Sequence, residues 1–152
     1  DSVNENLVII GTTNLFKDFD KALVRRFDAT INFNRYEKQD LIEIAMFIAE
    51  ELLNVFKFAG RNKRLLKKIL ETSDKLPYPG DLNNLLKTSF AFSNPNNEFD
   101  YLKKIFINIL GKENLTLDFL KDNRYTMREI ELLTGISKSQ VARELKGDNT
   151  YE

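Results

Sequence analysis

The order of hydrophobic and polar residues separates a short N-terminal part of this chain from a long helical part. From residue 37 onward, apolar residues recur at the spacing of one face of an α-helix. Polar or proline-containing breaks interrupt this pattern, which predicts four helices at about 37–56, 62–73, 81–92 and 98–110. Gly111 directly follows the fourth helix, where a glycine commonly ends a helix.

Three shorter helices are predicted after Gly111, the first at about 115–121. The sequences 126–129 and 137–140 both fit the capping box, in which a hydroxyl and the side chain three residues later satisfy each other's free amides. Gly135 lies between the two helices that these boxes begin, where a left-handed turn residue is needed. The pattern therefore predicts a compact three-helix unit.

The N-terminal part has a different pattern. The apolar run Leu7–Ile10 is stopped by Gly11, and such a short β-branched run predicts a buried strand of a parallel sheet. A short helix at about 20–26 and a second strand at about 29–34 follow. Two strands are too few for a stable sheet, so we expect this part to be the end of a truncated α/β domain.

The predicted fold class is therefore mainly α, with about two strands of an α/β core at the start. We expect the core remnant in residues 1–35 and a four-helix domain in residues 36–111. A three-helix unit is expected in residues 112–148, and residues 149–152 form a tail.

Composition narrows the possible chemistry. The 152 residues are 42% hydrophobic and 30% charged, which is typical of a globular protein in water. Lys plus Arg and Asp plus Glu number 23 each, so a nucleic-acid partner has to be argued from a local surface. The absence of Cys and His excludes disulfides and His- or thiolate-bound metal, so we expect no metal site and a cytoplasmic location. No apolar run approaches a membrane span, so we expect no membrane partner.

The N-terminal part contains two motifs. Residues 7–14 read Leu-Val-Ile-Ile-Gly-Thr-Thr-Asn, and residues 20–28 read Asp-Lys-Ala-Leu-Val-Arg-Arg-Phe-Asp. Together they resemble the second region of homology of the AAA ATPases. The family has a buried strand ending in Gly-Ala/Thr-Thr-Asn, then Asp-x-Ala-Leu-x-Arg and Arg-Phe-Asp. The Pro-Gly pair often found between its two arginines is missing here. The resemblance is close over residues 6–34 and looser over residues 37–110, which it implies to be the helical lid of an AAA+ protein.

The resemblance implies roles for individual residues. Asn14 would be the sensor-1 residue that contacts the γ-phosphate or the attacking water, next to Thr13 in the nucleotide site. Arg26 would be the arginine finger acting on a neighbouring subunit, accompanied by Arg25. Gly80 and Asp81 would belong to the sensor-2 region that lies over the nucleotide, although this chain has no arginine at the sensor-2 position. The implied assembly is a homo-oligomeric, hexameric ring that binds ATP and Mg²⁺.

Two parts of an ATP site are missing from the sequence. There is no G-x-x-x-x-G-K-[ST] phosphate loop and no apolar run ending in Asp-Glu, the Walker-B acid. In the family both precede the strand at Leu7. We therefore expect ATP and Mg²⁺ to be cofactors of the complete protein, and this fragment alone not to bind ATP tightly or hydrolyse it.

The C-terminal residues 129–145 resemble the helix-turn-helix of resolvases and repressors. The resemblance rests on Glu-Ile, then Gly-Ile-Ser-x-Ser, then Val-x-Arg-x-Leu. Its core would be apolar, and Glu131 departs from the usual alanine, which implies strain or a looser contact between the helices. The predicted core residues are Ile130, Ile136, Val141 and Leu145. The predicted DNA-binding residues are Ser137, Lys138, Ser139, Gln140, Arg143 and Lys146.

The main hypothesis is therefore an ATP-driven motor subunit with a DNA-binding tail. Two alternatives remain open. One is a protein-remodelling AAA+ ATPase whose tail docks a protein client. The other is a non-catalytic DNA-binding regulator with a degenerate AAA remnant.

Overall fold

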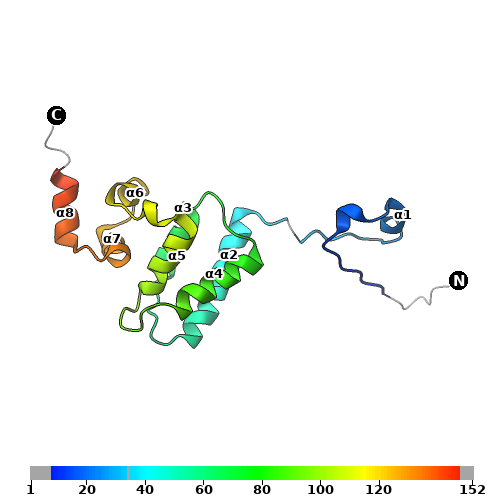
Figure 1. The fold of residues 1–152 in the computed structure, drawn as a ribbon, viewed down its shortest axis with the longest axis horizontal. Helices are drawn as coiled ribbons and strands as arrows, with labels where there is room; N and C mark the ends of the chain where they lie inside the picture. Colours follow the sequence, from blue (N-terminus) through cyan, green and yellow to red (C-terminus); the bar gives the residue numbers. More distant parts are fainter. Residues whose placement is uncertain (1–7, 34, 148–152) are drawn as a thin grey trace. The chain divides into compact units, whose positions relative to one another are not determined.

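The computed structural model describes residues 8–33 and 35–147, which form helices and no β-strand (Figure 1). Contacts divide the chain into two units, Asp1–Phe33 and Asn34–Glu152. The mainly helical fold class is thus confirmed. The two units are described one at a time.

The first unit contains a short 3₁₀ helix, η1 (Phe16–Asp18), and the single-turn helix α1 (Lys21–Val24). The side chain of Asp20 caps α1 by accepting a hydrogen bond of 2.9 Å from the backbone amide of Ala22. This cap explains where the helix begins, since the side chain satisfies an amide that has no partner within the helix. The helix predicted at 20–26 is present in shortened form.

The two predicted strands are wrong for the described residues. Val8, Ile9 and Ile10 have no regular secondary structure and are 82%, 66% and 84% exposed. The residues 29–33 also form no ladder, and Ile31 is 76% exposed. A β-branched run favours a strand only where another strand supplies hydrogen-bond partners and a face to bury. The two segments do not supply these for each other; Leu7 and Asn34 lie outside the described residues.

The second unit begins with a four-helix bundle, as predicted. Its helices are α2 (Lys38–Val55), α3 (Lys63–Thr72), α4 (Pro79–Ala91) and α5 (Asp100–Leu110). Asn62 begins α3 by accepting the amide of Leu65 at 3.1 Å. Pro79 occupies the first turn of α4, where its missing N–H costs nothing, and α4 therefore begins two residues earlier than predicted.

Helix α5 forms the centre of the second unit and packs against α3, α4 and α7. Tyr101, Leu102, Ile105 and Phe106 on this helix are all at most 1% exposed. Tyr101 stacks on Phe90 of α4, and its hydroxyl donates a hydrogen bond of 2.9 Å to the carbonyl of Gly60. Burial raises the pKa of Tyr101 to about 12, so the phenol stays protonated and keeps this bond.

Gly111 ends α5 with a φ of +89°, and the C-terminal helices follow as η2 (Lys112–Asn114), α6 (Leu117–Asp122), α7 (Met127–Thr134) and α8 (Lys138–Gly147). The regions expected as two domains, 36–111 and 112–148, fall within one unit because α7 packs on α5 (Figure 1). None of the helices in the described ranges combines the length and the apolarity needed to cross a membrane. The predicted tail 149–152 lies outside the described residues.

Candidate functional site

The residues predicted to sense nucleotide lie on the surface of the first unit. Asn14 and Thr13 are exposed and follow the extended segment that begins at Val8. The hydroxyl of Thr13 accepts a hydrogen bond of 3.0 Å from the amide of Leu15. This bond turns the backbone around Asn14, whose side chain remains accessible.

Arg25 and Arg26 follow α1 and are also exposed. Their backbone amides continue the helical turn, since Arg25 bonds to the carbonyl of Lys21 and Arg26 to that of Leu23. The Phe27 ring lies close to Gly11, in the segment before Asn14. A Cβ atom built on Gly11 would be 3.4 Å from this ring, which is ordinary van der Waals contact. The motif that contains Asn14 and the motif that contains both arginines therefore contact each other within this small unit.

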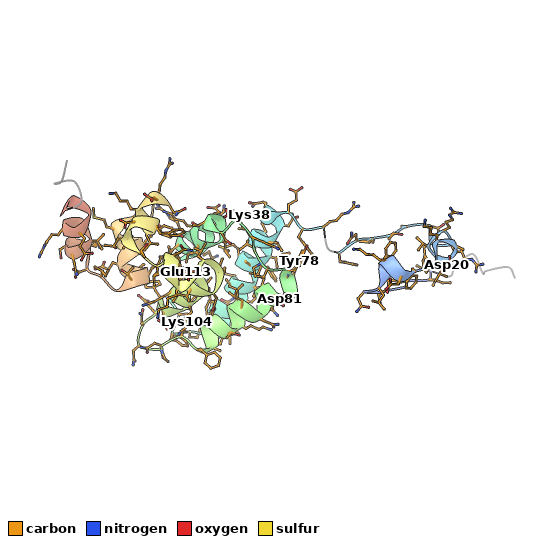
Figure 2. All side chains as sticks on the ribbon, turned by 45° about the horizontal axis from the view of Figure 1, so that its top comes forward. Asp20, Lys38, Tyr78, Asp81, Lys104 and Glu113 are labelled. Atoms are coloured by element: carbon orange, nitrogen blue, oxygen red, sulfur yellow. The ribbon has the colours of Figure 1, made fainter. Side chains whose placement is uncertain are left out.

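Gly80 and Asp81 belong to the second unit, in the exposed first turn of α4 (Figure 2). Nothing lies within 4 Å of a Cβ atom built on Gly80, so packing does not require a glycine there. Sequence reasoning missed two aromatic side chains beside this turn. The rings of Tyr36 and Tyr78 lie 6.4 Å apart and join the start of α2 to the start of α4. Tyr78 directly precedes α4 and Tyr36 lies two residues before α2, and this position near a helix start is the only signal the sequence offers for their meeting.

Helices α7 and α8 meet through a small apolar contact around a glycine turn. Ile130 and Val141 are buried at 1% and 0% exposure, and Ile136 is half-buried. Gly135 has a φ of +80°, the left-handed conformation that the turn requires. Three of the four predicted core residues are therefore buried or half-buried, and the side chain of Leu145 lies outside the described residues.

The predicted DNA-binding side chains lie on the open side of α8. Ser137, Lys138, Ser139, Gln140 and Arg143 are all exposed, while the side chain of Lys146 lies outside the described residues. An exposed polar face at the start of the second helix is the arrangement that helix-turn-helix proteins present to the major groove.

The two capping boxes of the C-terminal helices differ. The box at Thr126 is complete. The Thr126 hydroxyl accepts a hydrogen bond from the backbone amide of Glu129, and the Glu129 carboxylate accepts one from the backbone amide of Thr126. The box at Ser137 is only half formed. The amide of Gln140 donates to the hydroxyl of Ser137 at 3.4 Å, but the Gln140 side chain instead donates to Glu144 at 2.9 Å. The Gln140 side chain thus pairs with Glu144, one turn along the helix, and not with the backbone amide of Ser137 as a complete box requires.

Glu131, which departs from the usual alanine, makes a specific contact instead of a loose one. One of its carboxylate oxygens accepts the backbone amide of Lys138 at 3.4 Å. The other lies 3.7 Å from the ammonium group of the same residue. A carboxylate at the start of α8 is also favoured by the partial positive charge of a helix N-terminus. Glu131 therefore links α7 to the first turn of α8. It also forms an ion pair with Lys138, one of the predicted DNA-binding residues.

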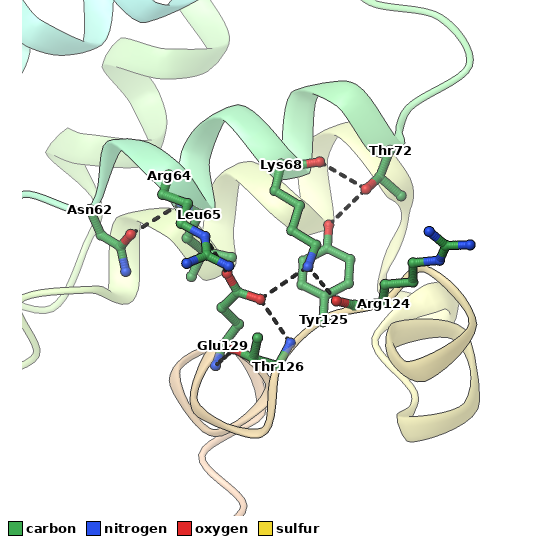
Figure 3. A network of polar contacts seen from close by, with 9 residues as sticks. All are labelled: Asn62, Arg64, Leu65, Lys68, Thr72, Arg124, Tyr125, Thr126 and Glu129. Carbon is green, nitrogen blue, oxygen red and sulfur yellow. Dashed lines mark hydrogen bonds and ion pairs between the residues drawn. The ribbon is translucent and has the colours of Figure 1, made fainter.

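A polar network fastens α7 to α3 (Figure 3). The Glu129 carboxylate is 8% exposed and receives the amide of Thr126 at 2.8 Å and the ammonium group of Lys68 at 3.1 Å. Arg64 stands 3.8 Å from its other oxygen. Burial alone would raise the pKa of Glu129, but the hydrogen bonds from Thr126 and Lys68 outweigh it and hold the pKa below 4.5.

Lys68 has three partners in this network. Besides Glu129, its ammonium group donates to the carbonyl of Arg124 at 2.5 Å and lies 4.6 Å above the ring of Tyr125. The Tyr125 hydroxyl in turn is 3.0 Å from that of Thr72. Burial raises the pKa of Tyr125, so its hydroxyl keeps its proton for this contact. The bundle and the C-terminal helices are thus joined by polar contacts as well as by the packing of α5 on α7.

Within the described ranges, no group of three or more His, Cys, Asp and Glu side chains is placed to hold a metal ion. Compared with protein-family models, curated proteins and solved structures, the chain matches none of them. Functional inference therefore depends on the motifs and on the geometry described above.

Proposed function

We propose that this chain is the C-terminal part of an AAA+ ATPase motor subunit and that α7 and α8 form a helix-turn-helix that binds DNA. The observation that carries the DNA proposal is the geometry of α7 and α8. Ile130 and Val141 close a core around the left-handed Gly135, while the start of α8 is exposed. This division leaves the polar face of α8 free to enter a major groove.

The exposed side chains have the chemistry needed to read bases. Arg143 and Lys138 can donate to the acceptors of guanine, and Gln140 can pair with adenine through two hydrogen bonds. Two of these groups are occupied in the free protein, Lys138 by Glu131 and Gln140 by Glu144. DNA binding would exchange these contacts for contacts with bases, which lowers the net gain in affinity. Ser137 and Ser139 would contact phosphates or bases, and Lys146 a phosphate.

The exposure of the N-terminal motifs supports the ATPase part of the proposal. In the complete protein, Asn14 would contact the γ-phosphate of ATP bound with Mg²⁺, with Thr13 beside it. Arg25 and Arg26 would reach the ATP of the neighbouring subunit in a hexameric ring. Gly80 and Asp81 would face the nucleotide from the first turn of α4. A ring would also multiply a weak DNA contact of each tail into a tight one.

DNA binding can be tested on the chain itself by fluorescence anisotropy with labelled duplex DNA over a range of salt concentrations. We expect affinity to fall steeply as salt rises, and Lys138→Ala with Arg143→Ala to weaken binding. The matched control is Lys57→Ala with Lys87→Ala, which removes two exposed cations outside α8. Equal affinity of the α8 double variant and the wild type would remove the recognition-helix assignment. No DNA binding at any salt concentration would favour the protein-docking alternative.

A further inference from the structure

A second surface of the protein, lined by residues outside α8, is rich in cations. It is an open groove of about 810 Å³ between α3, Met46 of α2 and the turn after α6. Five of its nine lining residues are basic and only Glu71 is acidic. The basic lining residues are Lys63, Arg64, Lys67, Lys68 and Arg124.

Carboxylates offset only part of this positive charge. Glu50 pairs with Lys63, Glu71 with Lys67, and the buried Glu129 with Lys68. Two more cations adjoin the groove, since Arg61 also pairs with Glu50 and Lys38 donates to the backbone carbonyl of Glu71. Seven cations therefore meet three carboxylates. The excess charge is local, because the whole chain is neutral.

Three cations of the groove are accessible to a partner. The Arg64 side chain is 80% exposed and the Lys67 side chain is 51% exposed. The guanidinium of Arg124 points away from Glu129 and out of the network (Figure 3). Lys68, by contrast, is only 22% exposed and is committed to Glu129. Arg64 also lies 3.8 Å from Glu129, but Lys68 forms the closer ion pair at 3.1 Å. Arg64, Lys67 and Arg124 can therefore bind a partner while the Lys68–Glu129 contact between α3 and α7 remains.

The arrangement of these cations suits an extended polyanion. Lys63 and Lys67, and likewise Arg64 and Lys68, are four residues apart on α3, so they form two parallel rows along the helix. Arg124 adds a cation from the turn after α6. A small anion would reach only one or two of these groups, whereas a chain of phosphates would reach more of them.

Duplex nucleic acid fits this groove better than single strands do. Proteins hold single strands by stacking their bases on aromatic side chains, and no aromatic residue is among those that line the groove. A duplex exposes its phosphates and sugars along its outside, and Lys and Arg contact these without reading the sequence. The choice of DNA over duplex RNA rests on the proposed function of α8.

We propose that the groove between α3 and the α6–α7 turn binds the phosphate backbone of duplex DNA, with Arg64, Lys67 and Arg124 as its main contacts. The groove provides sequence-independent attachment, and α8 provides sequence preference. It compensates for the weak charge of α8, where Lys138 is already paired with Glu131.

The test is the triple variant Arg64→Gln, Lys67→Gln and Arg124→Gln in the chain as described. Gln keeps a long side chain and removes only the charge. Binding of duplex DNA of random sequence is measured by anisotropy between about 50 and 200 mM salt. We expect weaker binding and a salt dependence whose slope, log affinity against log salt, falls by roughly 2–3. Circular dichroism and thermal melting verify that the variant remains folded.

The matched control is Lys57→Gln, Lys87→Gln and Lys112→Gln, three exposed lysines that do not line the groove. It changes the net charge by the same amount. Equal effects of the two triple variants on affinity and slope would overturn the proposal. So would a groove variant that loses binding to anionic lipid vesicles or to a second copy of the chain but not to duplex DNA.

The α8 double variant separates this proposal from the proposed function. If Lys138→Ala with Arg143→Ala has no effect while the groove variant weakens binding, the groove assignment stands and the α8 assignment fails. If only the α8 variant weakens binding, the groove assignment fails. Loss of sequence preference in the α8 variant, together with uniform loss across sequences in the groove variant, supports both.

Discussion

Lys68 Nζ lies 3.1 Å from Glu129 Oε2, and this ion pair joins α3 to α7 across 61 residues of sequence. The same ammonium group also holds the carbonyl of Arg124. One lysine of the bundle thereby fixes both the start of α7 and the turn that precedes it. The C-terminal helices are therefore attached to the bundle in a defined orientation.

Replacement of Glu129 by Gln should destabilise the second unit in a pH-dependent way. At neutral pH we expect a loss of about 1–2 kcal/mol in the free energy of unfolding. The contacts lower the folded pKa of Glu129, so their stabilisation is fully present above the ordinary pKa of 4.5. It disappears as the pH falls through the lower folded value, and the difference from wild type should shrink there. Urea unfolding followed by circular dichroism at several pH values measures this.

The control for Glu129 is Glu51→Gln, which removes an exposed carboxylate from α2. Its effect on unfolding should be small at every pH. A stability difference for Glu129→Gln that does not change with pH would contradict the assigned pKa direction.

Two glycines near helix ends should respond differently to alanine. Gly111 has a φ of +89° and a ψ of 149°, and a Cβ atom there would collide with the Glu113 side chain. Gly111→Ala should cost roughly 1–3 kcal/mol. Gly80→Ala meets no atom within 4 Å and should be neutral or stabilising by up to about 1 kcal/mol. Thermal melting measures the stability of both variants. A similar loss of stability in both would show that the positive φ of Gly111 does not cause the loss.

Glu131→Ala should strengthen DNA binding. The substitution frees Lys138 from its carboxylate partner and removes a negative charge beside the start of α8. We expect a gain of about 0.5–1 kcal/mol in binding, or roughly two- to fivefold in affinity. Anisotropy with duplex DNA measures the gain, and Glu51→Ala controls for the change in net charge. A gain of the same size in the control would assign the effect to overall charge.

For the proposed ATPase, Arg26→Ala should reduce ATP turnover by roughly 10³–10⁵-fold, as loss of an arginine finger does in other nucleotide hydrolases. ATP binding should persist, because the proposed finger would act on the ATP of a neighbouring subunit. Turnover by phosphate release and binding of a fluorescent ATP analogue are measured together. Arg35→Ala, which removes another exposed arginine, should retain turnover. Unchanged turnover in Arg26→Ala would remove the assignment.

Helix positions were predictable here because local chemistry determines them. Asn62 and Thr126 cap their helices by accepting the backbone amide three residues later, and Gly111 and Gly135 end theirs with positive φ values. The absence of a strand at residues 8–10 was not predictable in the same way. The composition of this segment favours a strand, but whether one forms depends on a partner strand that a local pattern does not reveal.

The candidate sites show the same division. The exposure of Arg143 and the burial of Val141 follow from helical spacing. The network around Lys68 does not, because Glu129 and Arg124 are distant from Lys68 in sequence and no local pattern links them to it. The basic groove was also not predictable from composition. Acidic and basic residues balance over the whole chain, but basic ones gather on one side of α3.

The extended segment with exposed Val8, Ile9 and Ile10 has a further consequence for the behaviour of the protein at high concentration. A β-branched run whose amides and carbonyls have no ladder partner can pair with the same run of another molecule. Such pairing adds strands edge to edge and has no natural stopping point. Self-association of the purified chain would therefore start at this segment and not at the helical unit, and a lysine in place of Ile9 would oppose it by charge repulsion.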